Sequence, residues 1–130
     1  MAEAPVYITS TAAFLPNAPV DNEEMERILG QVGVRPSRAR RAVLRSNGIK
    51  SRHYAIDPQT LQFTDTNAGM TAKAVRALAR GEGALPPIGC LACGTSIADQ
   101  LMPGHAVMVQ GALGLPACEV VSTPGTTSNS

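Results

Sequence analysis

Residues 88–122 read IGCLACGTSIADQLMPGHAVMVQGALGLPACEVVS, and this stretch decides the fold class. It starts with a short apolar run, Ile88–Cys93, that has the length of a buried strand and ends in Gly, Thr and Ser. Pro103 then opens a helical pattern that Gly114 ends. A second apolar run, Ala117–Ser122, predicts another strand. A strand, a helix and a strand in this order favour parallel pairing, because parallel strands need a long crossover between them.

The segment just before this stretch predicts the clearest helix of the chain. Asn67–Ala79 places Met70, Ala74, Val75 and Leu78 on one side. Thr66 or Asp65 is suited to cap the start of this helix, and Gly81 to end it.

Towards the N-terminus the same alternation continues. Val6–Ala13 is β-branched and apolar and predicts a first strand. Asp21 is placed to cap an acidic helix that runs to about Gly33, with its apolar face formed by Met25, Ile28, Leu29 and Val32. Residues 36–46 predict a short basic helix that Asn47-Gly48 ends, and residues 52–56 a short extended piece. The whole order predicts an α/β fold with a mostly parallel sheet covered by helices.

Composition limits the classes of protein to which the chain could belong. Its 130 residues fit one domain, 44% are hydrophobic, and the net charge is +1. The chain has neither a strongly basic composition nor aromatic residues interleaved with basic ones, so its composition does not indicate a nucleic-acid-binding protein. No apolar run approaches the roughly 20 residues that span a bilayer. The absence of a secretory signal and the odd number of cysteines lead us to expect a cytoplasmic protein.

Cys90 and Cys93 form a C-x-x-C pair, which could mark a redox pair or half of a zinc site. No second such pair and no paired histidines complete a zinc site, so no metal is predicted. Because the pair falls in an apolar run, buried strand thiols are the favoured interpretation, and the same holds for Cys118. His53 and His105 have no partner at motif spacing and are interpreted as structural or surface residues.

Several segments, taken in order, resemble the N-terminal half of the β-ketoacyl-acyl-carrier-protein synthase III enzymes, which have the thiolase fold. Residues 46–53, SNGIKSRH, match the family's "R-T-G-I-x-x-R" element, and residues 93–96, CGTS, match its strand end. Met102-Pro103 and residues 111–116, GALGLP, resemble the proline-led helix and the turn before the nucleophile strand. Residues 17–22 and 117–121 are most similar to the branch that makes dialkylresorcinols or aryl polyenes.

The resemblance implies a thiolase-like half-fold over residues 1–122, incomplete relative to the family, followed by a flexible tail over 123–130. It also implies decarboxylative thioester condensation in fatty acid or polyketide-type lipid synthesis. In such enzymes a cysteine thiolate accepts an acyl group from coenzyme A or an acyl carrier protein, and a C-terminal His and Asn stabilise the developing oxyanion. The acyl thioester is a substrate, and no cofactor is implied.

The sequence departs from the family at the nucleophile. The cysteine position falls near Thr127 or Ser128, and neither hydroxyl is a convincing nucleophile without a dedicated base. The C-terminal His and Asn do not occur in this chain either, so we assign no catalytic residue and expect the chain alone to be inactive.

Arg45 and Arg52 are the candidate binding residues. In the family, arginines near this element help to bind the nucleotide of coenzyme A or the phosphopantetheine arm of the carrier, and guanidinium groups bind phosphates in a bidentate manner. The alternative is a merely solvated basic helix face.

Three classes of function remain open. The first is an enzyme portion that acts as a homodimer or together with the missing C-terminal half. The second is a non-catalytic subunit that pairs with a second ketosynthase subunit. The third is a small redox or carrier-binding module that uses Cys90 and Cys93.

Overall fold

The computed structural model describes residues 4–31, 33–35, 39–79 and 84–125. Contacts divide the chain into two compact units, one formed by residues 1–14 with 66–130 and the other by residues 15–65. The half-fold predicted for residues 1–122 therefore extends over both units. Among the described residues, none of the helices has the length and apolar character needed to cross a membrane.

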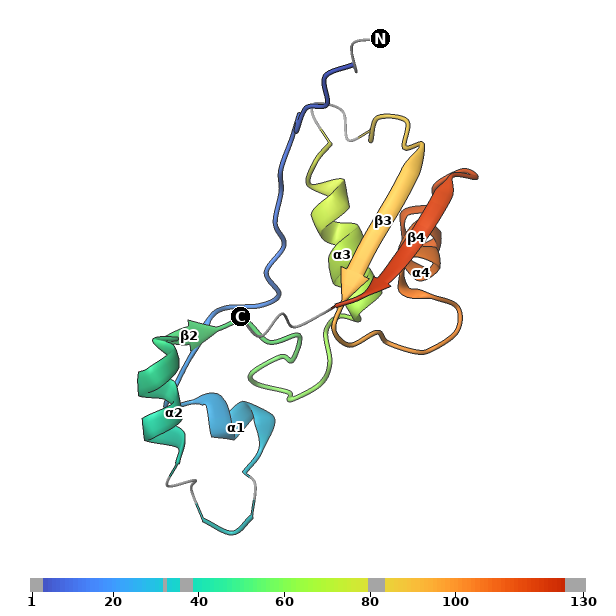
Figure 1. Ribbon diagram of the computed structural model, residues 1–130. Helices are drawn as coiled ribbons and strands as arrows, with labels where there is room; N and C mark the ends of the chain where they lie inside the picture. Colours follow the sequence, from blue (N-terminus) through green and yellow to red (C-terminus); the bar gives the residue numbers. More distant parts are fainter. Residues whose placement is uncertain (1–3, 32, 36–38, 80–83, 126–130) are drawn as a thin grey trace. The chain divides into compact units, whose positions relative to one another are not determined.

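The larger unit contains the strand, helix and strand that the sequence predicts. Strand β3 spans Cys90–Thr95, helix α4 spans His105–Leu113 and strand β4 spans Glu119–Pro124. β3 and β4 pair in parallel, with Cys90 opposite Glu119 and Thr95 opposite Pro124. The two arrows in Figure 1 lie side by side and point the same way. The predicted parallel pairing is therefore confirmed, although each strand begins two residues later than expected.

Helix α3 spans Asn67–Arg76 and starts where the sequence predicts. The Thr66 hydroxyl accepts a hydrogen bond from the Gly69 amide at 3.0 Å, so Thr66 is the cap. Two further amides, those of Asn67 and Ala68, donate to the Asp99 carboxylate, each at 2.8 Å. A carboxylate is favoured here because free amides and the helix dipole meet at a helix N-terminus.

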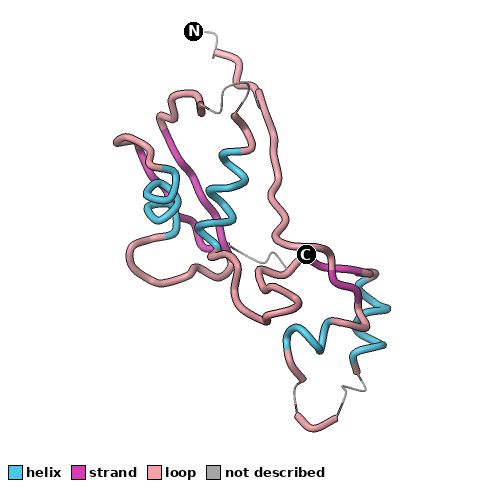
Figure 2. The backbone as a smooth tube through the Cα atoms, turned by 180° about the vertical axis from the view of Figure 1, so that it is seen from behind, coloured by secondary structure: helices cyan, strands magenta, loops and turns pink. Residues whose placement is uncertain are grey.

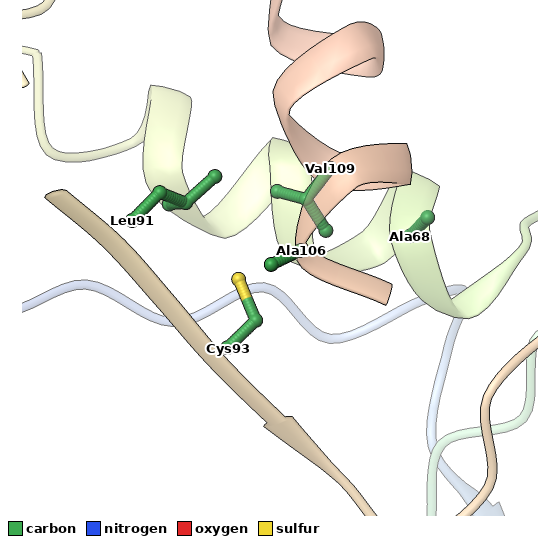
Figure 3. Packing of buried hydrophobic residues seen from close by; sticks show 5 residues of the cluster. All are labelled: Ala68, Leu91, Cys93, Ala106 and Val109. Atoms are coloured by element: carbon green, nitrogen blue, oxygen red, sulfur yellow. The ribbon is translucent and has the colours of Figure 1, made fainter. Parts of the chain in front are cut away.

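The core of this unit lies between one face of the sheet and the two helices. Its buried members are Ala68 from α3, Leu91 and Cys93 from β3, and Ala106 and Val109 from α4. Figure 3 shows the Cys93 and Leu91 side chains directed from the strand towards α4. Small residues at these positions let the helices approach the strand closely, as the aromatic-poor composition suggests.

The other face of β3 is open within the described part of the chain. Cys90, Ala92 and Gly94 are exposed and alternate with the buried residues of the core. The period of two along a strand produces this alternation.

The predicted first strand, Val6–Ala13, is wrong in this structure. The described part of that segment forms no ladder and runs as an extended loop (Figure 2), with Val6 at 96% and Ile8 at 89% of full exposure. A β-branched run needs a partner strand, and the described residues offer none to this segment. Its end is nevertheless held to this unit, because the Lys73 ammonium lies 4.8 Å from the centre of the Phe14 ring.

The smaller unit holds two short helices and a short antiparallel pair (Figure 1). Strand β1 spans Val20–Asp21, helix α1 Met25–Leu29, helix α2 Arg40–Asn47 and strand β2 Ser51–Arg52. β1 pairs antiparallel with β2, with Val20 opposite Arg52. The extended piece expected at residues 52–56 is thus reduced to Ser51–Arg52 and to an isolated bridge between Ile56 and Phe63.

Helix α1 is shorter than the sequence predicts, whereas the start expected for the second helix at residues 36–38 lies outside the described residues. The Asp21 carboxylate accepts from the Glu23 and Glu24 amides, each at 2.9 Å, so the predicted capping role is confirmed. α1 ends early, however, because Gly30 takes φ +83° and directs the chain away from the helix. α2 ends as expected at Gly48, which adopts the left-handed conformation with φ +66°.

A hairpin-like loop follows β2. The Asp57 carboxylate accepts from the Gln59 and Thr60 amides, each at 2.8 Å. The hydrogen bonds from the Thr60 and then the Gln59 backbone hold the pKa of Asp57 below its ordinary value, since they favour the charged form.

Candidate functional site

Arg45 and Arg52 both lie in the smaller unit, on different elements. Arg45 is in the last turn of α2 and is exposed. Arg52 is the second residue of β2 and is half-buried, and its guanidinium donates to the Asn22 side-chain oxygen at 2.6 Å. Asn22 in turn donates to the Ile49 carbonyl at 2.9 Å, which fixes the amide that orients Arg52. Arg52 is thus a positioned guanidinium, whereas Arg45 makes no hydrogen bond or ion pair with any described residue.

The ion pairs of this unit join the start of α1 to two arginines. Arg40 at the start of α2 contacts the carboxylates of Glu23 at 3.2 Å and Glu26 at 3.3 Å. Arg27 pairs with Glu24 at 3.1 Å and donates to the Pro58 carbonyl at 2.6 Å. Three carboxylates at the start of α1 thus share two guanidinium groups, and one negative charge remains on that side.

An apolar groove of about 390 Å³ lies between α1 and α2. Its walls are mainly aliphatic, with Arg40 and Glu26 as the charged members, and the full lining comprises Met25, Glu26, Leu29, Gly30, Ala39, Arg40, Val43 and Leu44. Leu29 and Val43 keep 52% and 57% of their surface exposed. The groove is thus open to solvent and adjoins the basic helix.

The three cysteines occupy different environments. Cys90 is exposed, Cys93 is buried and Cys118 is half-buried. Burial raises the pKa of the Cys93 thiol, because desolvation disfavours the thiolate. Cys118 lies just before β4 and accepts a long contact of 3.6 Å from the Gln110 side-chain nitrogen. The expected burial holds for Cys93 and in part for Cys118, and it is wrong for Cys90, which lies on the open face of the sheet.

Both histidines have structural surroundings, as expected. The His53 Nδ1 lies 3.0 Å from the Asn17 carbonyl and 3.3 Å from the Pro16 carbonyl, so it carries the proton that it donates. His105, the first residue of α4, is buried, and its Nε2 lies 3.3 Å from the Thr71 hydroxyl. This contact joins the start of α4 to α3.

The position predicted for the family's cysteine, near Thr127 or Ser128, lies outside the described residues. The same holds for residues 126–130 of the predicted tail, whereas Thr123 and Pro124 belong to β4. Among the described residues, no three His, Cys, Asp or Glu side chains gather as metal ligands.

Sequence reasoning overlooked two groups that the structure brings together. Asp99 reaches the start of α3 across about thirty residues, and Arg40 reaches Glu23 across the loop between α1 and α2. Neither pair has a spacing that marks it in the sequence. The sequence showed only that an acidic segment at residues 21–26 is followed by a basic segment at residues 35–52, and not which side chains pair.

Comparison with known proteins gives matches to condensing enzymes, while no family model matches the chain. A β-ketoacyl-[acyl-carrier-protein] synthase III of Cereibacter sphaeroides is 33% identical over 103 residues, which is 78% of this chain and 28% of that protein. The same enzyme from a second strain of that organism matches equally. The chain thus spans little more than a quarter of the length of these curated relatives.

A solved structure agrees with this sequence match. The tetronic acid condensing enzyme AbyA1 superposes with a TM-score of 0.65 and 28% sequence identity, over 89% of this chain and 35% of that one. The similarity in sequence to the synthase III enzymes and the structural match support the same conclusion. This chain carries part of the α/β fold of the thiolase-like condensing enzymes.

Proposed function

We propose that this chain forms the N-terminal portion of a synthase-III-like condensing enzyme that joins thioester-activated acyl units. The observation that carries the proposal is the match of 33% identity over 103 residues, supported by a shared fold over 89% of the chain. The α/β element of this chain is the parallel pair β3–β4 with α3 and α4 packed on one face.

The finer assignment within this class rests on sequence alone. Residues 17–22 and 117–121 favour the dialkylresorcinol or aryl-polyene branch. The substrates would then be acyl chains delivered by coenzyme A or by an acyl carrier protein, and the product a longer β-keto thioester.

We assign to this portion a role in binding rather than in covalent chemistry. Thr127 or Ser128 stands where the family has its cysteine, and the Cys93 thiol faces the core with a raised pKa. A buried thiol with a raised pKa is a poor nucleophile, since the thiolate is the attacking species. The complete reaction would need residues from a further polypeptide segment or subunit.

Within this portion, Arg45 and Arg52 are the proposed ligands of the phosphate groups of the acyl donor. Arg52 is held by Asn22 through one guanidinium nitrogen, which leaves its other donors available. Arg45 is exposed on α2, as an arginine must be to meet a ligand that arrives from solvent.

Intact-mass spectrometry after incubation with a short-chain acyl-coenzyme A tests the covalent part. We expect the mass of the chain without an acyl adduct. An adduct that survives denaturation would show that the chain holds a competent nucleophile and would overturn the assignment to binding alone.

Calorimetric titration with coenzyme A tests the binding part. We expect Arg45→Ala and Arg52→Ala each to weaken binding about tenfold, because each removes a charge-assisted contact of roughly 1.5 kcal/mol. Arg35→Ala, which removes an equal charge from an exposed loop position, serves as the matched control. Pantetheine lacks phosphate and is expected to bind all four proteins equally. If the unchanged chain and the three variants bind coenzyme A with equal affinity, the proposed phosphate site is contradicted.

A further inference from the structure

The end of α2 places an asparagine carboxamide next to an unshielded backbone nitrogen. Asn47 is the last residue of α2 and is exposed. Gly48 follows in the left-handed conformation with φ +66°, and a Cβ built on it would meet nothing within 4 Å. The Gly48 nitrogen is therefore open to solvent and has no side chain beside it. A backbone nitrogen in this position can attack the side-chain carbonyl carbon of the preceding asparagine and close a cyclic imide.

The amide that follows α2 is held less firmly than those that follow the other long helices. After α3 the Ala77 amide donates to the Lys73 carbonyl, and after α4 the Gly114 amide donates to the Gly111 carbonyl, each at 3.1 Å. The Gly48 amide makes no bond of this kind with the described residues. It can therefore react without giving up a closing hydrogen bond of the helix.

The carboxamide of Asn47 is also held differently from those of the other asparagines in the described part of the chain. Its Oδ1 accepts a hydrogen bond from the Ile49 amide at 2.9 Å, which stabilises the negative charge that an attack on Cγ places on this oxygen. The Nδ2 atoms of Asn17, Asn22 and Asn67 donate to backbone carbonyls at 2.8, 2.9 and 2.8 Å. The Nδ2 of Asn47 has no such acceptor among the described residues, so it leaves without breaking a hydrogen bond.

We propose that Asn47 is a site of spontaneous deamidation that alters the connection between α2 and β2. The Gly48 nitrogen gives its proton to a solvent base and bonds to the Asn47 Cγ. The bond from Cγ to Nδ2 then breaks, and this nitrogen takes up a proton and departs as ammonia. Water opens the cyclic imide at either of its carbonyl carbons and leaves aspartate or isoaspartate. The sum converts asparagine and water into an acidic residue and ammonia, and nothing is oxidised or reduced.

The product changes both the charge and the path of the chain. Its carboxylate stands at the C-terminal end of α2, where the helix dipole disfavours a negative charge. Isoaspartate also carries the main chain through Cγ, which adds one carbon before Gly48. Both changes act next to Ile49, whose carbonyl accepts from Asn22 at 2.9 Å, while Asn22 accepts from the Arg52 guanidinium at 2.6 Å. Deamidation therefore releases the positioned guanidinium, and this last step deepens the proposed function and rests on it.

Peptide mapping of the stored 130-residue chain tests the modification itself. Trypsin yields the peptide 46–50, in which Asn47 is the one asparagine, and mass spectrometry with electron-transfer fragmentation distinguishes aspartate from isoaspartate. We expect deamidation at Asn47 to be at least about tenfold faster than at Asn22 and Asn67, because residues with a Cβ follow those two. The rate at Asn47 in the folded chain should lie within about threefold of its rate in urea, since its surroundings are open.

Asn47→Ser is the matched variant, because its hydroxyl keeps an acceptor for the Ile49 amide and cannot form the imide. In the ¹⁵N-labelled parent chain, storage should shift the amide signals of residues 47–52 and the side-chain amide of Asn22. The Asn47→Ser chain should show no such shifts. Asn47→Asp introduces the charge without the extra carbon and should reproduce part of them. Coenzyme A should bind the stored parent several-fold more weakly than the fresh one, and stored and fresh Asn47→Ser chains equally.

Each part of the proposal has an outcome that overturns it. Deamidation at Asn47 no faster than at Asn22, or a rate in the folded chain far below that in urea, would remove the modification site. Shifts that stop at Gly48 and leave the Asn22 side chain and Arg52 unchanged would remove the link to the guanidinium. A fresh chain that does not bind coenzyme A would contradict the proposed phosphate site alone, because the peptide map and the amide signals are read without that ligand.

Discussion

Gly125 follows β4 at a point where the chain has no room for a side chain. Its amide donates to the Thr95 carbonyl at 2.7 Å. A Cβ atom built on Gly125 would lie 2.8 Å from the Ser96 backbone nitrogen and 2.9 Å from the Ser96 Cα. Backbone atoms cannot move aside as a flexible side chain can, so the close approach of the two strand ends depends on this glycine.

We therefore expect Gly125→Ala to destabilise the chain by about 1–3 kcal/mol, the usual cost of overpacking. Gly111→Ala is the matched control, because Gly111 lies in the last turn of α4 and its Cβ would meet nothing within 4 Å. That change should be stabilising by about 0.5–1 kcal/mol through helix propensity. Urea unfolding of both variants checks the opposite signs, and equal effects would contradict the packing argument.

The cysteines give a second prediction at the scale of single residues. Cys90 and Cys93 lie on opposite faces of β3, with Cys90 exposed and Cys93 in the core. We expect Cys90 to react with a thiol reagent at near-peptide rates at pH 8, and Cys93 to react at least a hundredfold more slowly because it is buried.

The raised pKa of Cys93 also makes the free energy of unfolding depend on pH, because the folded chain favours the protonated thiol. This contribution to stability is complete below the ordinary thiol pKa and is lost as pH rises through the pKa of Cys93 in the folded chain. Mass spectrometry of labelled peptides, with Cys90→Ser as control, separates the two sites. A Cys90–Cys93 disulfide formed under mild oxidation would revive the interpretation as a redox module.

At the scale of elements, the start of α3 depends on side chains from two parts of the chain. Thr66 accepts a hydrogen bond from the Gly69 amide within the first turn. Asp99, which lies in the loop after β3, accepts hydrogen bonds from the two preceding amides of the helix. We expect Thr66→Ala to cost about 1 kcal/mol. Asp99→Ala should cost more, about 1–3 kcal/mol, because it leaves two amides without a charged acceptor.

Thermal unfolding followed by circular dichroism checks this order. Thr66→Ser keeps the hydroxyl and should be close to neutral. Should Asp99→Ala prove milder than Thr66→Ala, the carboxylate would be a peripheral contact rather than part of the cap.

The contrast between α3 and the segment at residues 6–13 shows what local sequence determines. α3 was predictable because its cap, its apolar side and its starting point all lie within a dozen residues. An extended segment becomes a strand only when another segment pairs with it, and a β-branched pattern does not specify that partner. The same reasoning explains why the pairing of Val20–Asp21 with Ser51–Arg52, across some thirty residues, was not anticipated.

The candidate site was predictable to a similar extent. The basic run and the position of Arg52 beside the Asn-Gly turn were visible in the sequence, whereas the groove and the pairing of Arg40 with Glu23 and Glu26 were not. Charge counts show which groups are available. Only the fold decides which of them pair with one another and which, like Arg45, have no charged partner among the described residues.

At the scale of the whole chain, apolar surface remains exposed in the described residues. The open face of β3 is one part of it, and sheets of parallel strands are normally covered on both faces. Other parts are exposed aliphatic side chains such as Val6, Ile8, Leu101 and Met102, each more than four-fifths exposed. Surface of this kind favours association.

We therefore expect the purified 130-residue chain to form oligomers, or to exist as a loosely packed monomer that unfolds over a broad temperature range. Sedimentation velocity at several concentrations, together with scanning calorimetry, distinguishes these states. Leu101→Gln with Met102→Gln should reduce association without lowering the stability of the monomer, because both side chains are almost fully exposed and their replacement leaves no cavity. A monomer that melts in one sharp, cooperative transition would contradict this expectation, since it would show that the exposed faces need no partner.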